Sequence, residues 1–130
     1  MKYLGIDFGT KRIGISFSDE DGRVAFPLSV LENSEKIIEE IKKIISEKKI
    51  DKVVVGESKD FNMKDNPIMK DIKEFSEKLL EDKIAVVFHP EFFTSQEAIQ
   101  IQGKNEMLDA SAATIILQSY LDKQKNDINR

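Results

Sequence analysis

The sequence predicts an α/β fold in which three antiparallel strands and two parallel strands form one mixed sheet, with helices on both of its faces. Two short segments, residues 52–55 and 84–88, are almost wholly apolar and are typical of buried parallel strands. Segments with helical periodicity alternate with them, whereas residues 1–31 show strand patterns. A run of strands followed by βα units predicts a mixed five-stranded sheet.

The opening part of the chain has the pattern of a three-stranded meander. Residues 2–6 and residues 12–18 are rich in residues that favour strands. Asp21 and Gly22 form a strong hairpin signal, which connects the second strand to a third over residues 24–31. We therefore expect these three strands to be antiparallel neighbours.

Helical periodicity follows in the rest of the chain. We expect helices over residues 37–45, 67–80, 94–103 and 106–121. Asn33 and Ser34 are cap candidates for the first helix, and Thr94 with Glu97 forms a capping box for the third. Residues 122–130 are polar and are expected to form a frayed tail.

The length of 130 residues fits one domain with one core, and no internal repeat or linker is visible. The expected order of elements, β-β-β-α-β-α-β-α-α, is that of the ribonuclease H-like arrangement, although the order by itself does not exclude other mixed α/β folds. We expect residues 1–130 to form a single domain of this kind.

Composition excludes several classes of site. The chain has no cysteine and one histidine, His89, so a metal would be bound mainly by oxygen, which favours magnesium, manganese or calcium. No signal peptide and no apolar run of ~20 residues is visible, so we expect a cytoplasmic protein without a membrane segment. The net charge of −4 argues against a protein that coats nucleic acid non-specifically.

Three carboxylates occupy positions beside apolar segments, where a charged side chain is unfavourable and therefore suggests a function. Asp7 ends the first strand, and Glu91 follows the apolar segment 84–88, which Pro90 is expected to stop. Asp109 lies in the last helix, on a face that its spacing predicts to be buried. The other members of that face are Ala112, Ala113, Ile116 and Tyr120.

Such a cluster has a clear use in phosphodiester chemistry. Crowded carboxylates repel each other, and divalent cations remove that repulsion, activate a water molecule and stabilise a leaving oxygen. Taken singly, each residue has an ordinary explanation. Asp7 also fits a turn or helix cap, and Asp109 also fits a first-turn residue that the helix dipole favours. The joint pattern favours a metal-dependent site.

Three motifs resemble those of the YqgF/RuvX family, which is described as pre-16S ribosomal RNA nucleases and as Holliday-junction-resolvase-like proteins. They are LGIDFGTKRIG (residues 4–14), PEFFTSQEA (90–98) and LDASAATIILQSYL (108–121), in the family's order. The resemblance implies an RNase H-like fold and an endonuclease that uses Mg²⁺ or Mn²⁺ on structured RNA, such as pre-rRNA, or on branched DNA. It also implies that Asp7, Glu91 and Asp109 are the catalytic metal ligands.

The sequence departs from the family pattern beside two of these motifs. Pro90 and Phe92 replace the acidic and basic neighbours of the family's glutamate, so a phosphate-binding arginine is lost. The family's Gly-Leu-Pro after its buried strand is here Gly56-Glu57-Ser58. In resolvase-like relatives a glutamate near this strand end is a metal ligand, so Glu57 is either an additional ligand or an ordinary loop residue.

Four basic residues are candidates for phosphate contacts. They are Lys11, Arg12, Lys59 and Lys64. The first two follow the Asp7 motif, and the others lie in the polar segment 57–66; charged loops are also commonly just solvated. His89 ends a buried strand, where packing is a more common role than catalysis.

Two other functions compete with the nuclease. The D-x-G-T pattern of residues 7–10 also occurs in the phosphate-binding hairpin of actin-like and sugar-kinase ATPases, but no second copy is visible. A binding module for a ribosomal or repair partner would keep the fold without the activity, although it would have no need for a repulsive carboxylate cluster. A homodimer would suit a two-stranded junction.

Overall fold

A computed structural model describes residues 1–58, 68–91 and 108–128 of the chain. The strands are β1 (Tyr3–Phe8), β2 (Arg12–Ser18), β3 (Ala25–Glu32), β4 (Lys52–Ser58) and β5 (Val86–Glu91). The helices are α1 (Ile37–Lys48), α2 (Met69–Glu81) and α4 (Leu108–Ile128). The predicted helix over residues 94–103 and its capping box lie outside the described residues.

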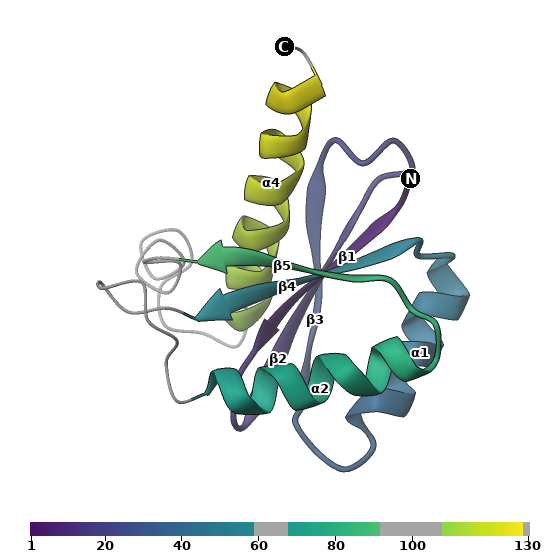
Figure 1. The fold of residues 1–130 in the computed structure, drawn as a ribbon, viewed down its shortest axis with the longest axis vertical. Helices are drawn as coiled ribbons and strands as arrows, with labels where there is room; N and C mark the ends of the chain where they lie inside the picture. The colour runs from purple at the N-terminus through teal and green to yellow at the C-terminus, as the bar shows by residue number, and fades with distance from the viewer. Residues whose placement is uncertain (59–67, 92–107, 129–130) are drawn as a thin grey trace.

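The five strands form one mixed sheet, as predicted, and the structure gives their order as β3-β2-β1-β4-β5. The β1–β2 and β2–β3 pairs are antiparallel, whereas β4 is parallel to both β1 and β5. Helices α1 and α2 cover one face and α4 crosses the other, which gives three layers (Figure 1). None of the described helices has both the length and the apolar character that a membrane crossing requires.

Strand alternation divides the core between the two faces of the sheet. Leu4 and Ile6 point to the side of α1 and α2, where they join the larger apolar cluster. Tyr3 belongs to the cluster on the α4 side. By the same alternation Gly5 and Asp7 lie on the α4 side.

The α4 face of the central strands has small residues, so the helix lies close to the sheet. A Cβ atom on Gly5 would lie 2.3 Å from Ser16 Oγ, 2.8 Å from Leu117 Cβ and 3.1 Å from the Ala113 carbonyl oxygen. Ser16 also donates a hydrogen bond of 2.8 Å to that carbonyl. Ala113 is fully buried and adds only one methyl group. Ala113 therefore lets the last helix lie close to the sheet.

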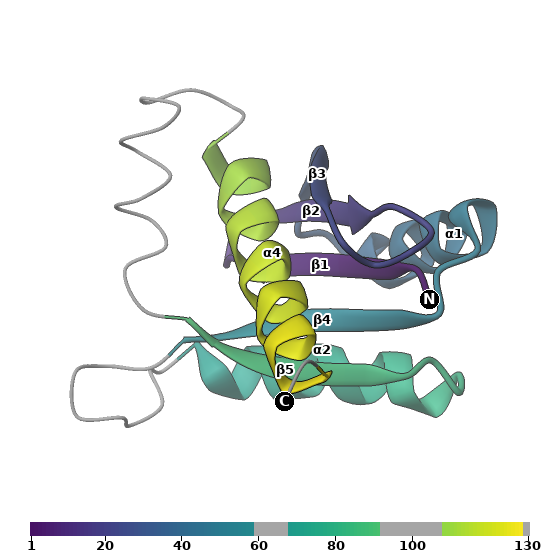
Figure 2. The same ribbon diagram turned by 90° about the horizontal axis from the view of Figure 1, so that it is seen from above.

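The same helix runs antiparallel to β1. At the beginning of the strand, the Tyr3 hydroxyl donates a 3.0 Å hydrogen bond to Gln124 in the second half of α4. Two residues further along the strand, Gly5 lies against Ala113, nearer the beginning of the helix. Figure 2 shows α4 crossing the sheet, with its beginning on the side of β2 and its later part on the side of β5.

Two local predictions need correction. The connection after β2 is not a two-residue hairpin at Asp21-Gly22, because residues 19–24 form a longer turn. The Asp19 carboxylate organises it by accepting the N–H groups of Arg23 and Val24, and these hydrogen bonds hold the pKa of Asp19 below its usual value.

Asn33 does not cap α1, which has Lys36 at its N-cap position and no side-chain cap. The Asn33 side chain instead donates to the Gly9 carbonyl at 2.9 Å, and its backbone N–H donates to the Lys11 carbonyl at 2.9 Å. Ser34 accepts the Lys36 N–H through its hydroxyl.

Element ends also differ from the sequence patterns. Strand β5 continues through Pro90 to Glu91, which an edge strand tolerates because one row of its N–H groups needs no partner in the sheet. Strand β4 extends to Ser58, and α4 extends to Ile128 rather than ending at Leu121. Glu57 and Glu91 are therefore the second-last and last residues of adjacent strands.

The close contact at Gly5 gives a stability prediction. Gly5→Ala places a methyl group within contact distances that side chains cannot occupy, so α4 must move away from the sheet. We expect the free energy of unfolding to fall by about 2 kcal/mol or more. Urea unfolding measures this change, with Glu40→Ala on the exposed surface of α1 as the control; equal midpoints for the two variants would contradict the close packing.

Candidate active site

Asp7 lies near the end of β1, partly exposed and on the face that α4 covers. Its antiparallel partner on β2 is Gly14. On the other side, one position beyond the Ile6–Val55 pair, the next residue of β4 is Gly56. Both neighbours are glycines, so neither adjacent strand places a side chain directly beside Asp7.

His89 lies in β5, two positions before Glu91 at the end of the strand. Gly56 is paired with His89, and Ser58 is paired with Glu91. Val54, two residues before Gly56, packs in the α4-side cluster. Alternation therefore places Asp7 and His89 on the α4 side, toward the carboxyl ends of the parallel strands β1 and β5, which lie on either side of β4.

Asp109 is the second residue of α4. Ala113, one turn later, lies against Gly5. A step of two residues along β1 leads from Gly5 to Asp7 over roughly 7 Å, and one helical turn back from Ala113 leads to Asp109 over roughly 6 Å. Because helix and strand run antiparallel, the backbone positions of Asp7 and Asp109 lie near each other.

The three predicted catalytic residues thus have backbone positions at one edge of the sheet, where the ends of strands commonly form ligand sites. The side chains of Glu91 and Asp109 are outside the described part of the structure. Within that part, no three histidine or acidic side chains gather as a metal site. The donor set itself consists of carboxylates, and this is the chemistry that Mg²⁺ and Mn²⁺ prefer.

Glu57 has a different position from the other three. Val53 and Val55 belong to the cluster on the α1 and α2 side, so alternation places Glu57 on that side, opposite to Asp7. Burial lowers the pKa of His89, and the charge of Glu57 opposes part of that shift across the strand ends. A role for Glu57 as an additional metal ligand stays a prediction.

Lys11 and Arg12 lie exposed directly after the Asp7 motif. The backbone between them and Asp7 is held by Asn33, which donates to the carbonyl groups of Gly9 and Thr10 at 2.9 and 3.4 Å. The backbone that leads to these two basic residues is therefore fixed beside the candidate site. Lys59 and Lys64, the other predicted phosphate contacts, lie outside the described residues.

His89 is buried and lies between β5 and α4. Its Nε2 atom forms a 2.9 Å hydrogen bond with Ser119 Oγ, and its ring meets Tyr120 edge to face at 5.9 Å between centroids. Burial lowers the pKa of His89 below the ordinary value of 6.5; the charge of Lys123 lowers it further, and Glu57 opposes both. The packing role that the sequence favoured is confirmed.

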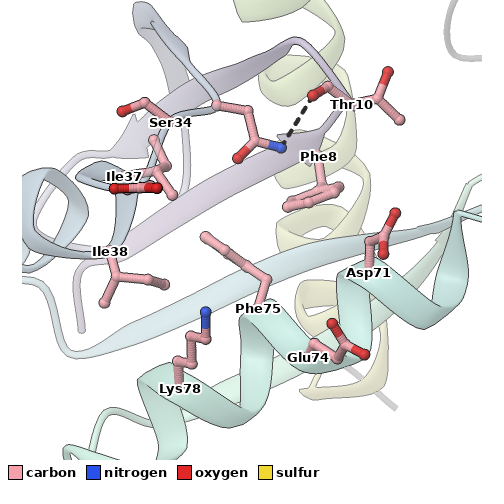
Figure 3. A pocket seen from close by; sticks show the side chains of 11 residues that line it. Phe8, Thr10, Ser34, Ile37, Ile38, Asp71, Glu74, Phe75 and Lys78 are labelled. Atoms are coloured by element: carbon pink, nitrogen blue, oxygen red, sulfur yellow. Dashed lines mark hydrogen bonds between the residues drawn. The ribbon is translucent and has the colours of Figure 1, made fainter.

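A pocket of about 260 Å³ lies near the end of β1 on the other face of the sheet (Figure 3). Phe8 and Phe75 line its apolar part, and their rings lie 5.2 Å apart. Asp71, Glu74 and Lys78 of α2 line its polar side. Asp7 does not line this pocket because it points to the opposite face from Phe8. The cavity is therefore separate from the candidate active site.

Sequence reasoning missed three features of the site. Gly14 and Gly56 flank Asp7, and only the strand register reveals that they are its neighbours. Ser119 pairs with His89 from the other end of the sequence, and a serine in a helix gives no such signal. Asn33 carried a signal, but the same residue type serves both helix caps and loops.

Comparison with protein families and curated proteins supports the predicted resemblance. A family model described as "RuvX: Holliday junction resolvase" matches residues 1–123. A protein of Sulfurihydrogenibium sp. is 37% identical over 131 residues, covering 94% of this chain and 90% of the relative. One of Caldanaerobacter subterraneus is 36% identical, covering 97% and 99%. Both are named "Putative pre-16S rRNA nuclease".

Solved structures confirm the predicted RNase H-like fold. The structure titled "T. thermophilus RuvC in complex with Holliday junction substrate" matches with a TM-score of 0.62 and covers 96% of each chain. A fowlpox virus resolvase with substrate Holliday junction DNA matches with a TM-score of 0.59 and covers 95% of this chain and 99% of its own. Sequence identities are 14% and 12%, so the likeness concerns the fold alone.

The surroundings of His89 predict that the stability of the fold depends on pH. Because its pKa is lowered in the folded state, the unfolded chain binds more protons as pH falls below about 6.5. The stability that neutral His89 contributes is therefore complete above that pH and is lost as pH falls through the folded pKa. As the chain's one histidine, it gives an unambiguous NMR titration. An apparent pKa at or above 6.5, or a pH dependence of unfolding unchanged in His89→Gln, would contradict this.

Proposed function

Because the chain belongs to the RuvX family of Holliday junction resolvases, we propose that it is a metal-dependent endonuclease that hydrolyses phosphodiester bonds in structured nucleic acid. The observation that supports the proposal is that Asp7 and Glu91 lie near the carboxyl ends of parallel strands, while Asp109 lies in the first turn of the helix that packs on β1. The family is one of nucleases, and acidic residues at this edge supply the groups that such chemistry requires.

Each side chain has a defined role in this proposal. Asp7, between two glycines, and Asp109, across from it on α4, bind Mg²⁺ or Mn²⁺ from the strand and the helix. Glu91 completes the set from β5. A bound divalent ion would supply an activated water molecule and charge stabilisation for the leaving oxygen. Lys11 and Arg12, on the loop that Asn33 holds, contact flanking phosphates and orient the scissile bond.

The substrate that we propose first is structured precursor ribosomal RNA, because the curated relatives at 36–37% identity carry that name. A cytoplasmic location fits such a substrate. Branched DNA is the second candidate, which the family description favours. A homodimer would present one site to each strand of a branched substrate. The net charge of −4 implies that affinity comes from local contacts rather than from the whole surface.

An Asp7→Asn variant provides the central test. We expect wild-type protein to cut labelled pre-16S rRNA or a four-way DNA junction with Mn²⁺ or Mg²⁺ and not with EDTA. Asp7→Asn removes a negative charge at the metal position with almost no change in shape, and should lower the cleavage rate at least 100-fold. Gel analysis of end-labelled products measures both the rate and the cleavage position.

Asp21→Asn is the matched control, because Asp21 is exposed in the turn between β2 and β3. It should cut at the wild-type rate. Folded wild-type protein that binds these substrates without cutting them would replace the nuclease by a binding module. Equal cleavage by wild type and Asp7→Asn would point to a contaminating nuclease.

Glu57→Gln tests the proposed additional ligand. Because alternation places Glu57 on the opposite side from Asp7, it reaches the metal only around the end of β4. We expect Mn²⁺ affinity to fall by less than about tenfold, much less than in Asp7→Asn. Isothermal titration with Mn²⁺ measures both variants. An unchanged affinity would remove Glu57 from the ligand set, and a loss equal to that of Asp7→Asn would make it a principal ligand.

A further inference from the structure

Strand β5 is an edge strand, so within the sheet it is held only through its pairing with β4. It nevertheless carries Glu91 at its last position. Asp109 lies on a separate element, α4. The distance between these two proposed catalytic positions therefore depends on what fixes β5 relative to α4.

A side-chain hydrogen bond makes this connection. His89 of β5 and Ser119 of α4 are joined at 2.9 Å between Nε2 and Oγ. His89 is 9% exposed, whereas Ser119 is exposed, so the hydrogen bond lies at the border between the layers and the solvent. A hydrogen bond with access to water contributes modestly to global stability. Its larger effect is to define where the strand sits under the helix.

The neighbouring groups hold the imidazole in place. The Tyr120 ring meets His89 edge to face, and its hydroxyl accepts a 2.7 Å hydrogen bond from Gln124. The Gln124 side chain in turn accepts the Tyr3 hydroxyl at 3.0 Å. These two hydrogen bonds join β1 to α4 and do not include the imidazole, which meets Tyr120 through the rings alone.

We propose that the His89–Ser119 hydrogen bond is a positioning device, which sets the distance between Glu91 on β5 and Asp109 on α4. His89 lies two residues before Glu91, roughly 7 Å along the strand. Both residues belong to the same strand, so a shift of His89 relative to the helix is carried along the backbone to the end of β5. The catalytic purpose of this device rests on the nuclease function proposed above.

The test compares variants that remove the His89–Ser119 hydrogen bond, a variant that can replace it, and a control that removes a different hydrogen bond to α4. His89→Leu and Ser119→Ala remove the hydrogen bond, whereas His89→Gln offers an amide group near the position of Nε2. Tyr3→Phe is the matched control, because it removes a hydrogen bond to α4 from β1 rather than from β5. Cleavage kinetics with Mn²⁺ are measured beside urea unfolding and hydrogen exchange of the β5 amides.

We expect His89→Leu and Ser119→Ala to lower kcat about tenfold with KM changed less than twofold, because a misplaced carboxylate affects the chemical step. The double variant should be no worse than either single variant. His89→Gln should recover to within about threefold of wild type, and Tyr3→Phe should keep wild-type kcat. Exchange of the β5 amides should be faster in His89→Leu and Ser119→Ala than in Tyr3→Phe.

Wild-type kcat in both His89→Leu and Ser119→Ala would overturn the proposal, as would an equal loss in Tyr3→Phe, which would indicate general loosening of α4. A failure of the nuclease proposal looks different, because wild-type protein would then cut neither substrate. In that case faster β5 exchange in His89→Leu and Ser119→Ala would still establish the link between β5 and α4, but its catalytic purpose would be overturned.

Discussion

The close approach of α4 to β1 and β2 is the constraint on which the rest of the structure depends. Gly5 has no side chain where the helix crosses β1, and Ser16 binds the helix backbone directly through the Ala113 carbonyl. A helix at this distance can bring an acidic residue of its first turn to the end of β1. With an ordinary apolar residue at position 5, the helix would lie farther out and Asp109 would be removed from Asp7.

This packing also explains how carboxylates can be grouped on a chain that is already acidic. The central strands supply glycine and serine on the α4 face, so Asp7 lies between Gly14 and Gly56 rather than against apolar side chains. Most apolar residues of the same strands point to the other face, where they form the larger core with α1 and α2, whereas Tyr3 and Val54 belong to the smaller cluster under α4. Strand alternation thus separates stability on one face from chemistry on the other.

Polar side chains outside the carboxylate set connect the elements that carry it. Gln118 accepts the backbone N–H of Ala25 at 2.9 Å and so holds α4 over β3. His89 holds the same helix over β5, at the other edge of the sheet. Asn33 fixes the loop after β1 from the end of β3. Each of these contacts joins residues far apart in sequence, and each lies near an element that carries a proposed catalytic or phosphate-binding residue.

The sequence by itself determined the order of strands and helices, the mixed sheet and the three acidic positions. These follow from local patterns: alternating or wholly apolar strands, helical spacing, and charges at positions that otherwise look buried. It did not determine that β5 passes through Pro90, because a proline is tolerated only where the strand lies at an edge, and edges are set by pairing. Nor could it assign Asn33 to a loop rather than a helix cap.

Only the tertiary structure decided which residues surround the carboxylates. The pairing of Asp7 with Gly14, the face of Glu57 and the contact of His89 with Ser119 depend on strand register and on how α4 crosses the sheet. A shift of one residue in register moves every side chain of a strand to the opposite face. That register is fixed by packing between distant segments, so no local pattern in the sequence contains it.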